Sequence, residues 1–118
     1  MDQFCSTTIS AWSPVQAPAD VYGTFHCGVA PGGPCNENNG LGGKYTAPGG
    51  PLPADFHTYG IQWDRSTPTE EIRWYLDGAL YGTINSSQWY SSAAPDNPRA
   101  PFDSRFHLLV NVAVGGNF

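Results

Sequence analysis

The stretch EIRWYLDGALYGTI, residues 71–84, decides the fold class because it has the pattern of a β-hairpin. Every second residue from Ile72 to Leu76 is apolar, and side chains along a strand point to opposite faces in turn. Asp77 and Gly78 separate the two arms, and a type I′ turn needs the positive φ that this pair tolerates. The hairpin therefore carries an apolar face that has to be buried against a second sheet.

The rest of the chain has the same character, short strands joined by loops. It has 118 residues with 14 Gly and 11 Pro, a composition that favours many turns, and no segment has a convincing helical pattern. Three further strands are predicted, at residues 21–27, 56–63 and 105–114. Two long loops are predicted at residues 28–53 and 86–103, and residues 1–20 read as an irregular N-terminal arm. We expect an all-β, antiparallel β-sandwich.

The predicted strand at residues 105–114 has two different faces. Alternate residues from Phe106 to Val114 are all apolar, so we expect this face to pack between the two sheets. The opposite face carries His107 and Asn111 among smaller apolar residues. A half-polar face of this kind suits an open, concave surface.

Charge and hydropathy exclude two classes of partner. The formal net charge is −5, and a negative field repels phosphate backbones, so we expect no nucleic acid. No apolar run approaches the roughly 18 residues of a membrane span, so we expect no membrane. The first residues have neither a basic region nor a long apolar run, so we expect no signal peptide in this sequence.

Four motifs carry a resemblance to a known family. VYGTFHCG, FHTYGIQWD, IRWYLDGALYGTI and FHLLVNVAVGGNF resemble the C-terminal half of glycoside hydrolase family 16, and PGGPCN resembles its secreted fungal members. The resemblance implies an incomplete concanavalin-like jelly roll over residues 21–118. It also implies β-glucan as the partner, endo-hydrolysis of β-1,3- or β-1,3-1,4-glucan with retention, and a secreted, extracellular or cell-wall location.

The catalytic motif of that family is missing from this sequence. A retaining mechanism needs two carboxyl groups about 5 to 5.5 Å apart, and the family places them on one strand as E-x-D-x-E or E-x-D-x-x-E. We expect that strand upstream of residue 21, where no such motif stands, and none of the ten acidic residues forms a same-face pair in the predicted strands. The catalytic residues are therefore unassigned, and we expect the chain to be inactive alone.

Two alternatives follow from this absence. The chain can be a non-catalytic β-glucan-binding module, or a partial domain whose unpaired strand edges drive self-association.

The resemblance nominates several residues for sugar contact. His26 matches a cleft-lining position, and Trp63 is equally suited to the core or to a sugar. Asn111 matches the family motif and lies near His107, and Phe118 stands where a ring could stack on a pyranose. No cofactor is expected. No metal site is expected either, because no His or Cys pair has ligand spacing.

The cysteines and one Asn-Ser-Ser sequon predict covalent modifications of the chain. Cys27 and Cys35 bracket a Gly/Pro-rich loop that can bring its ends together, so we predict a disulfide and an oxidising compartment. Cys5 is left without an evident partner. Asn85 begins an Asn-Ser-Ser sequon and is a candidate glycosylation site.

Overall fold

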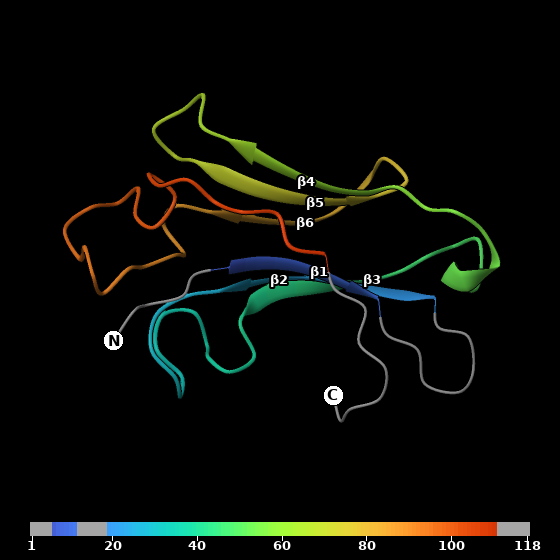
Figure 1. The fold of residues 1–118 in the computed structure, drawn as a ribbon, viewed down its shortest axis with the longest axis horizontal. Coiled ribbons are helices and arrows are strands. Elements are labelled where there is room, and N and C mark those ends of the chain that lie inside the picture. Colours follow the sequence, from blue (N-terminus) through green and yellow to red (C-terminus); the bar gives the residue numbers. More distant parts are fainter. Residues whose placement is uncertain (1–5, 12–18, 111–118) are drawn as a thin grey trace.

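Two three-stranded antiparallel sheets stack face to face in the computed structural model, which describes residues 6–11 and 19–110 (Figure 1). The first sheet has the order β1 (Ser6–Ala11), β2 (Asp20–His26), β3 (Leu41–Thr46). The second has the order β4 (Tyr59–Asp64), β5 (Glu71–Leu76), β6 (Ala79–Asn85), and a short 3-10 turn, η1, spans Leu52–Ala54. The predicted all-β, antiparallel sandwich is confirmed.

The core lies between the two central strands. Alternate residues of β2 and β5 are buried because one face of each strand points to the opposite sheet. Trp74 is fully buried at the centre, between Gly23 of β2 and Gly82 of β6. A Cβ on Gly23 would lie 2.6 Å from Trp74 Cγ, and one on Gly82 would lie 2.9 Å from Cε3. The two glycines therefore make the space that the indole fills.

The β5–β6 hairpin forms as the sequence predicts. Asp77 and Gly78 both have positive φ, 49° and 81°, as a type I′ turn requires. The Asp77 carboxylate also accepts a hydrogen bond of 2.8 Å from the Thr58 backbone N–H and contacts His57 Nδ1 at 2.6 Å. The turn is thereby fastened to the segment that leads into β4.

One flank of the sandwich is closed and the other is open. On the closed flank, β3 and β6 contact each other across the two sheets. On the open flank, β1 and β4 have a hydrogen-bonded neighbour on one side only among the described residues. The inward side chains of β4 (Tyr59, Ile61 and Trp63) remain substantially exposed.

Several predicted boundaries are wrong. A strand, β1, lies within the expected irregular arm, and another, β3, lies within the expected loop of residues 28–53. Both are held by pairing with β2 rather than by their own apolar pattern. The strand expected from Phe56 begins at Tyr59 instead.

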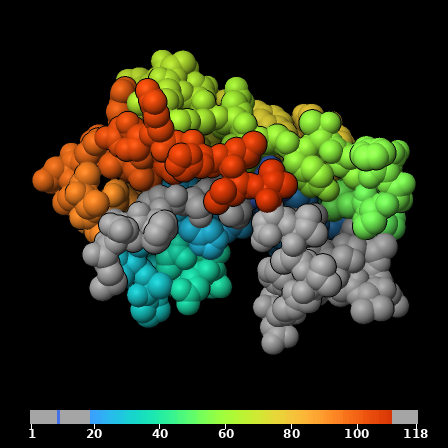
Figure 2. Space-filling model, in the orientation of Figure 1, coloured from blue at the N-terminus to red at the C-terminus, as the bar shows by residue number. Residues whose placement is uncertain are grey.

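The expected strand at residues 105–114 is absent over its described part. Residues 105–110 form no strand, and Phe106, Leu108 and Val110 are exposed rather than packed between the sheets. Strand pairing supplies the hydrogen bonds that hold an extended segment, and no described strand pairs with this one. In Figure 2 the orange-red residues of this segment run along the visible surface below the green residues of the β4 region. Residues 111–114 lie outside the described part of the chain.

The loop after β6 contributes to the core. Trp89 and Phe102 are buried, and their rings pack on Phe25 with centroid distances of 6.1 and 5.2 Å. The loop is fixed through Glu70, a fully buried carboxylate that contacts Arg99 Nε at 3.4 Å. Two opposed layers and this loop thus enclose a small core. Within residues 6–11 and 19–110, no helix is long and apolar enough to cross a membrane.

Candidate functional site

The outward face of the first sheet is the candidate site. Because Val21, Gly23 and Phe25 of β2 point inward, the alternate residues Tyr22, Thr24 and His26 point outward and are partly exposed. This places one aromatic ring, one hydroxyl and one imidazole in a row along the strand. Side chains of these kinds stack on sugar rings and exchange hydrogen bonds with sugar hydroxyls.

The imidazole at the end of this row is paired with a carboxylate. His26 Nδ1 lies 3.0 Å from Glu37 Oε2, and Glu37 Oε1 accepts a hydrogen bond of 2.9 Å from the Cys27 backbone N–H. The His26 side chain is 32% exposed and that of Glu37 is 12% exposed. Glu37 is therefore a largely buried group that holds a more accessible ring.

A disulfide closes the loop that delivers this carboxylate. It joins Cys27 to Cys35, the pair for which the sequence predicts one, with the two Cα atoms 5.4 Å apart. The Glu37 backbone N–H donates to the Gly32 carbonyl at 2.7 Å, which adds a second tie inside the loop.

At the other end of the face, Asp20 closes the row with two hydrogen bonds. Its carboxylate accepts from Thr46 Oγ1 at 2.6 Å and from Lys44 Nζ at 3.1 Å. These bonds, that of Thr46 first, hold the pKa of Asp20 below its ordinary value. The same ion pair raises the pKa of Lys44.

A strand does lie beside β2 where the catalytic strand is expected, which corrects one prediction. Its Cα partners along the candidate face are Ser6 with His26, Thr8 with Thr24, and Ser10 with Tyr22. The sequence of β1 is STTISA, which contains neither Asp nor Glu.

The carboxylates at the two ends of the face cannot replace the missing pair. Asp20 is the first residue of β2, and Glu37 is bound to the last. A strand rises about 3.3 Å per residue, so roughly 20 Å separate these two ends. A retaining pair requires about 5 to 5.5 Å. The described part of this face therefore holds an aromatic ring and hydrogen-bonding side chains, and no retaining carboxylate pair.

A same-face carboxylate pair does occur on the outward face of the second sheet, contrary to prediction. Asp64 of β4 and Glu71 of β5 are direct register partners, and both contact the Arg73 guanidinium, Asp64 at 3.2 Å. Hydrogen bonds from Ser66, and then from Arg73, lower the pKa of Asp64. Because both carboxylates contact the same guanidinium, they are arranged as an ion-pair network rather than as an acid and a nucleophile.

Trp63 lies on the open flank, away from the candidate face. Its Nε1 donates to Glu70 Oε2 at 3.2 Å, and its ring packs on Phe102 and Phe106 with centroid distances of 5.6 and 6.2 Å. The Arg65 guanidinium lies 5.0 Å from the ring centroid. These contacts occupy the ring with protein neighbours.

The remaining predicted residues are not gathered at the face. His107 is exposed on the segment after Phe106, while Asn111, Phe118 and Cys5 lie outside the described residues. The Asn85 side chain accepts hydrogen bonds from the Ser87 backbone and hydroxyl, so the predicted sequon folds as a turn. The described residues contain no group of His, Cys, Asp or Glu side chains that could hold a metal ion.

Sequence reasoning missed Glu37, Tyr22 and Lys44. Glu37 stands two residues after Cys35 in a loop with no strand pattern. The one clue to its position in the sequence is the predicted disulfide, which brings this part of the loop close to Cys27 and His26.

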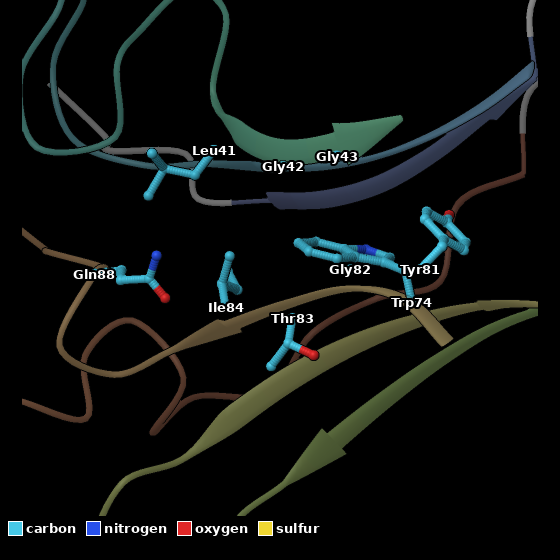
Figure 3. A pocket seen from close by; sticks show the side chains of 9 residues that line it. All are labelled: Leu41, Gly42, Gly43, Trp74, Tyr81, Gly82, Thr83, Ile84 and Gln88. Atoms are coloured by element: carbon cyan, nitrogen blue, oxygen red, sulfur yellow. The ribbon is translucent and has the colours of Figure 1, made fainter. Parts of the chain in front are cut away.

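A cavity of about 330 Å³ opens on the closed flank, between the edges of β3 and β6 (Figure 3). It is lined mainly by glycines and apolar side chains, with Thr83 and Gln88 as polar members. It lies between the sheets and is separate from the outward face of β2.

The chain is similar to glucan-active proteins. Residues 36–105 match the protein family described as "Glycosyl hydrolases family 16". The chain is 44% identical over 102 residues to "Glucan endo-1,3-beta-glucosidase A1" of Niallia circulans, covering 86% of this chain and 14% of that protein. It is 34% identical over 104 residues to "Beta-1,3-glucan-binding protein" of Penaeus monodon, covering 79% of this chain and 27% of that protein.

A solved structure agrees with these matches. The endo-1,3-beta-glucanase from Streptomyces sioyaensis superposes with a TM-score of 0.61 and 41% identity, over 70% of this chain and 29% of that one. The chain thus spans less than a third of each of these three proteins. They come from bacteria and an animal, so they give no support to the expected likeness to fungal members. By its sequence and its fold, this chain belongs to glycosyl hydrolase family 16.

Proposed function

We propose that this chain supplies a β-glucan-binding face to an endo-hydrolase of β-1,3- or β-1,3-1,4-glucan, and that the chain alone does not cleave glucan. The observation that carries the proposal is β1, a strand paired with β2 beside His26 whose sequence contains no carboxylate. Side chains of kinds that stack on and hydrogen-bond to sugars lie along β2, while a retaining pair is missing from the described part of that face.

The chemistry of the face supports glucan as the ligand. A β-glucan is neutral, rich in hydroxyl groups and presents flat apolar ring faces. The row of Tyr22, Thr24 and His26 offers a ring and hydrogen-bonding groups, and the nearby charges of Asp20 and Lys44 are paired with each other. Relatives named as a glucanase and as a glucan-binding protein share binding to this polymer, and the chain matches both.

Several finer assignments belong to the same proposal. The retaining mechanism is that of the family and requires two carboxylates beyond those gathered on this face. Secretion, or a place at the cell wall, agrees with the disulfide between Cys27 and Cys35, because disulfides persist in oxidising compartments.

The experiment measures binding and cleavage together. Laminarin and mixed-linkage β-glucan are offered to the purified chain, with reducing-sugar release and affinity electrophoresis read in parallel. Tyr22→Ala should raise the dissociation constant for laminarin, read from the retardation, about tenfold. This is the effect of losing roughly 1.4 kcal/mol of binding free energy. Arg73→Ala, on the outward face of the other sheet, is the matched control and should leave binding unchanged.

Each outcome decides between candidates. Saturable binding that Tyr22→Ala weakens, without sugar release, supports the proposal. Release of reducing sugar would contradict the claim that the chain alone does not cleave glucan. Equal retardation of wild type and Tyr22→Ala would mean that the glucan site lies elsewhere.

A second candidate is a protein that only binds β-glucan, with no hydrolysis in any form. The relative named as a β-1,3-glucan-binding protein favours it. The two candidates separate in an assay of any longer chain that contains this sequence. Sugar release there supports the hydrolase, and binding without release supports the binding protein.

We also propose that the open flank supports self-association. Among the residues that the structure describes, no strand pairs with the outer edges of β1 and β4, and strand edges of this kind pair with other chains. Sedimentation velocity over a hundredfold concentration range should show mass increasing with concentration. A single monomeric boundary throughout would reject this.

A further inference from the structure

We propose that Glu37 is a positioning residue that fixes the tautomer of His26, so that Nε2 faces the ligand as a hydrogen-bond acceptor for a sugar hydroxyl. This inference rests on the proposed function of the β2 face. It assigns to a loop carboxylate a role in ligand recognition rather than in catalysis.

The chemistry of the pair dictates the tautomer. Glu37 Oε2 lies 3.0 Å from His26 Nδ1, and an ionised carboxylate can only accept hydrogen bonds. Nδ1 must therefore carry the hydrogen. In the neutral ring this leaves Nε2 with a free lone pair, so the ring accepts a hydrogen bond at the atom that Glu37 does not hold.

Glu37 is held too firmly to be an incidental surface partner. Its second oxygen accepts the Cys27 backbone N–H at 2.9 Å, and its own N–H donates to the Gly32 carbonyl at 2.7 Å. The disulfide at Cys27 and Cys35 closes the loop on the strand. An exposed ion pair loses much of its value to side-chain entropy, and these ties remove that freedom before the pair forms.

The position of the ring leaves it available to a ligand. His26 is the last residue of β2, on the same outward row as Tyr22 and Thr24, and about a third of its side chain is exposed. The bond from Glu37 to Cys27 would already secure the loop without His26. Its bond to the ring uses the other oxygen and sets the ring's protonation pattern, a function that loop closure does not require.

Glu37→Gln is the sharpest test because it preserves shape and reverses one hydrogen bond. The Gln oxygen keeps the bond from the Cys27 N–H, so the Gln amide nitrogen faces Nδ1 and donates to it. Nδ1 then becomes the acceptor and the hydrogen moves to Nε2. Long-range ¹H–¹⁵N correlation spectra of the ring should show Nδ1 protonated in the wild type and Nε2 protonated in Glu37→Gln.

The binding measurement tests the consequence. Glu37→Gln should lower the affinity for laminarin about tenfold, because Nε2–H can no longer accept from the sugar. In a His26→Ala background, Glu37→Gln should have no further effect, as expected when one residue acts through another. Glu71→Gln, on the second sheet, is the matched control and should change neither the ring spectrum nor the affinity.

The outcomes separate this inference from the function on which it rests. A wild-type ring protonated at Nε2 would overturn the inference without any variant. So would an affinity loss in Glu37→Gln that persists in the His26→Ala background, because that loss would not pass through the ring. If the tautomer reverses as expected but the wild type does not bind laminarin, the positioning role stands while the sugar-acceptor role and the proposed function both fail.

Discussion

Two tryptophans on adjacent strands of the same sheet have opposite surroundings. Trp74 of β5 and Trp63 of β4 both point toward the first sheet, yet Trp74 is 0% exposed and Trp63 is 37% exposed. Trp74 meets Gly23 of the opposite sheet, whereas Trp63 meets the loop residues Phe102 and Phe106. Pointing inward therefore buries a side chain fully at the centre of the sandwich but leaves it partly exposed on the open flank.

This difference predicts where the stability of the sandwich resides. The centre, built on β2 and β5, combines full burial with close contact between the two sheets. The open flank, where Trp63 of β4 meets residues 102–106, is held by one strand pairing and by a few aromatic contacts. The following substitutions test the contrast, and each is measured by urea unfolding followed by circular dichroism.

Trp74→Ala should have the largest effect. Removing a fully buried indole loses its transfer free energy and leaves a cavity, so we expect a loss of about 3–5 kcal/mol in the free energy of unfolding. A loss below about 1 kcal/mol would mean that the centre is as loosely packed as the flank.

Gly23→Ala attacks the same contact from the other sheet. The new Cβ would lie 2.6 Å from Trp74 Cγ, so the indole or β2 has to move, and we expect a loss of about 1–3 kcal/mol. Paired with Trp74→Ala, the same substitution should cost much less because the clash is gone. Equal costs in the two backgrounds would contradict the close contact.

Trp63→Ala should cost less than either change at the centre. The ring is partly exposed and contacts Phe102, Phe106, Glu70 and Arg65, so we expect a loss of about 1–2 kcal/mol. A cost equal to that of Trp74→Ala would show that the flank is as tightly packed as the centre.

Tyr81→Phe should stabilise the closed flank. The Tyr81 hydroxyl is buried with no hydrogen-bond partner among the described residues, and burial raises its pKa to about 12. Removing an unsatisfied polar atom should gain about 1 kcal/mol. The gain should grow above pH 10, because the unfolded Tyr81 ionises there while the folded one does not. A destabilised variant would indicate that the hydroxyl has a partner after all.

Asp77→Asn should have the smallest effect, which is present at neutral pH and disappears in acid. The hydrogen bond with His57, and then that from Thr58, lower the pKa of Asp77 below its ordinary value of 3.8. Its stabilisation is therefore complete above about pH 4 and is lost as the pH falls through the folded pKa. Asn tolerates the positive φ of the turn, so the variant should unfold with a weaker pH dependence below pH 4. An unchanged acid profile would exclude this contribution.

The sequence predicts the strands that carry their own apolar pattern. The β5–β6 hairpin follows from the alternation up to Leu76 and from the Asp77-Gly78 turn. By contrast, β3 contains two glycines and a lysine and becomes a strand only because β2 offers it hydrogen bonds, which no local pattern records. The segment after Phe106 fails for the complementary reason, since it has the pattern but no described partner strand.

The site was predictable to a similar degree. His26 was identified because a motif surrounds it, and the disulfide because two cysteines bracket a Gly/Pro-rich loop. Glu37 could not be assigned a role, since a loop carboxylate acquires one only when the closed loop brings it to the ring. The pair of Asp64 and Glu71 was missed because its two members are brought together by register across two strands.

The glycines on either side of Trp74 have an evolutionary consequence. No single substitution among Gly23, Trp74 and Gly82 preserves the fit, since a larger residue clashes with the indole and a smaller one at position 74 leaves a void. The three positions are therefore epistatic and have to change together. Relatives that keep the tryptophan should keep both glycines, while relatives that lose it should be free to carry side chains at both positions.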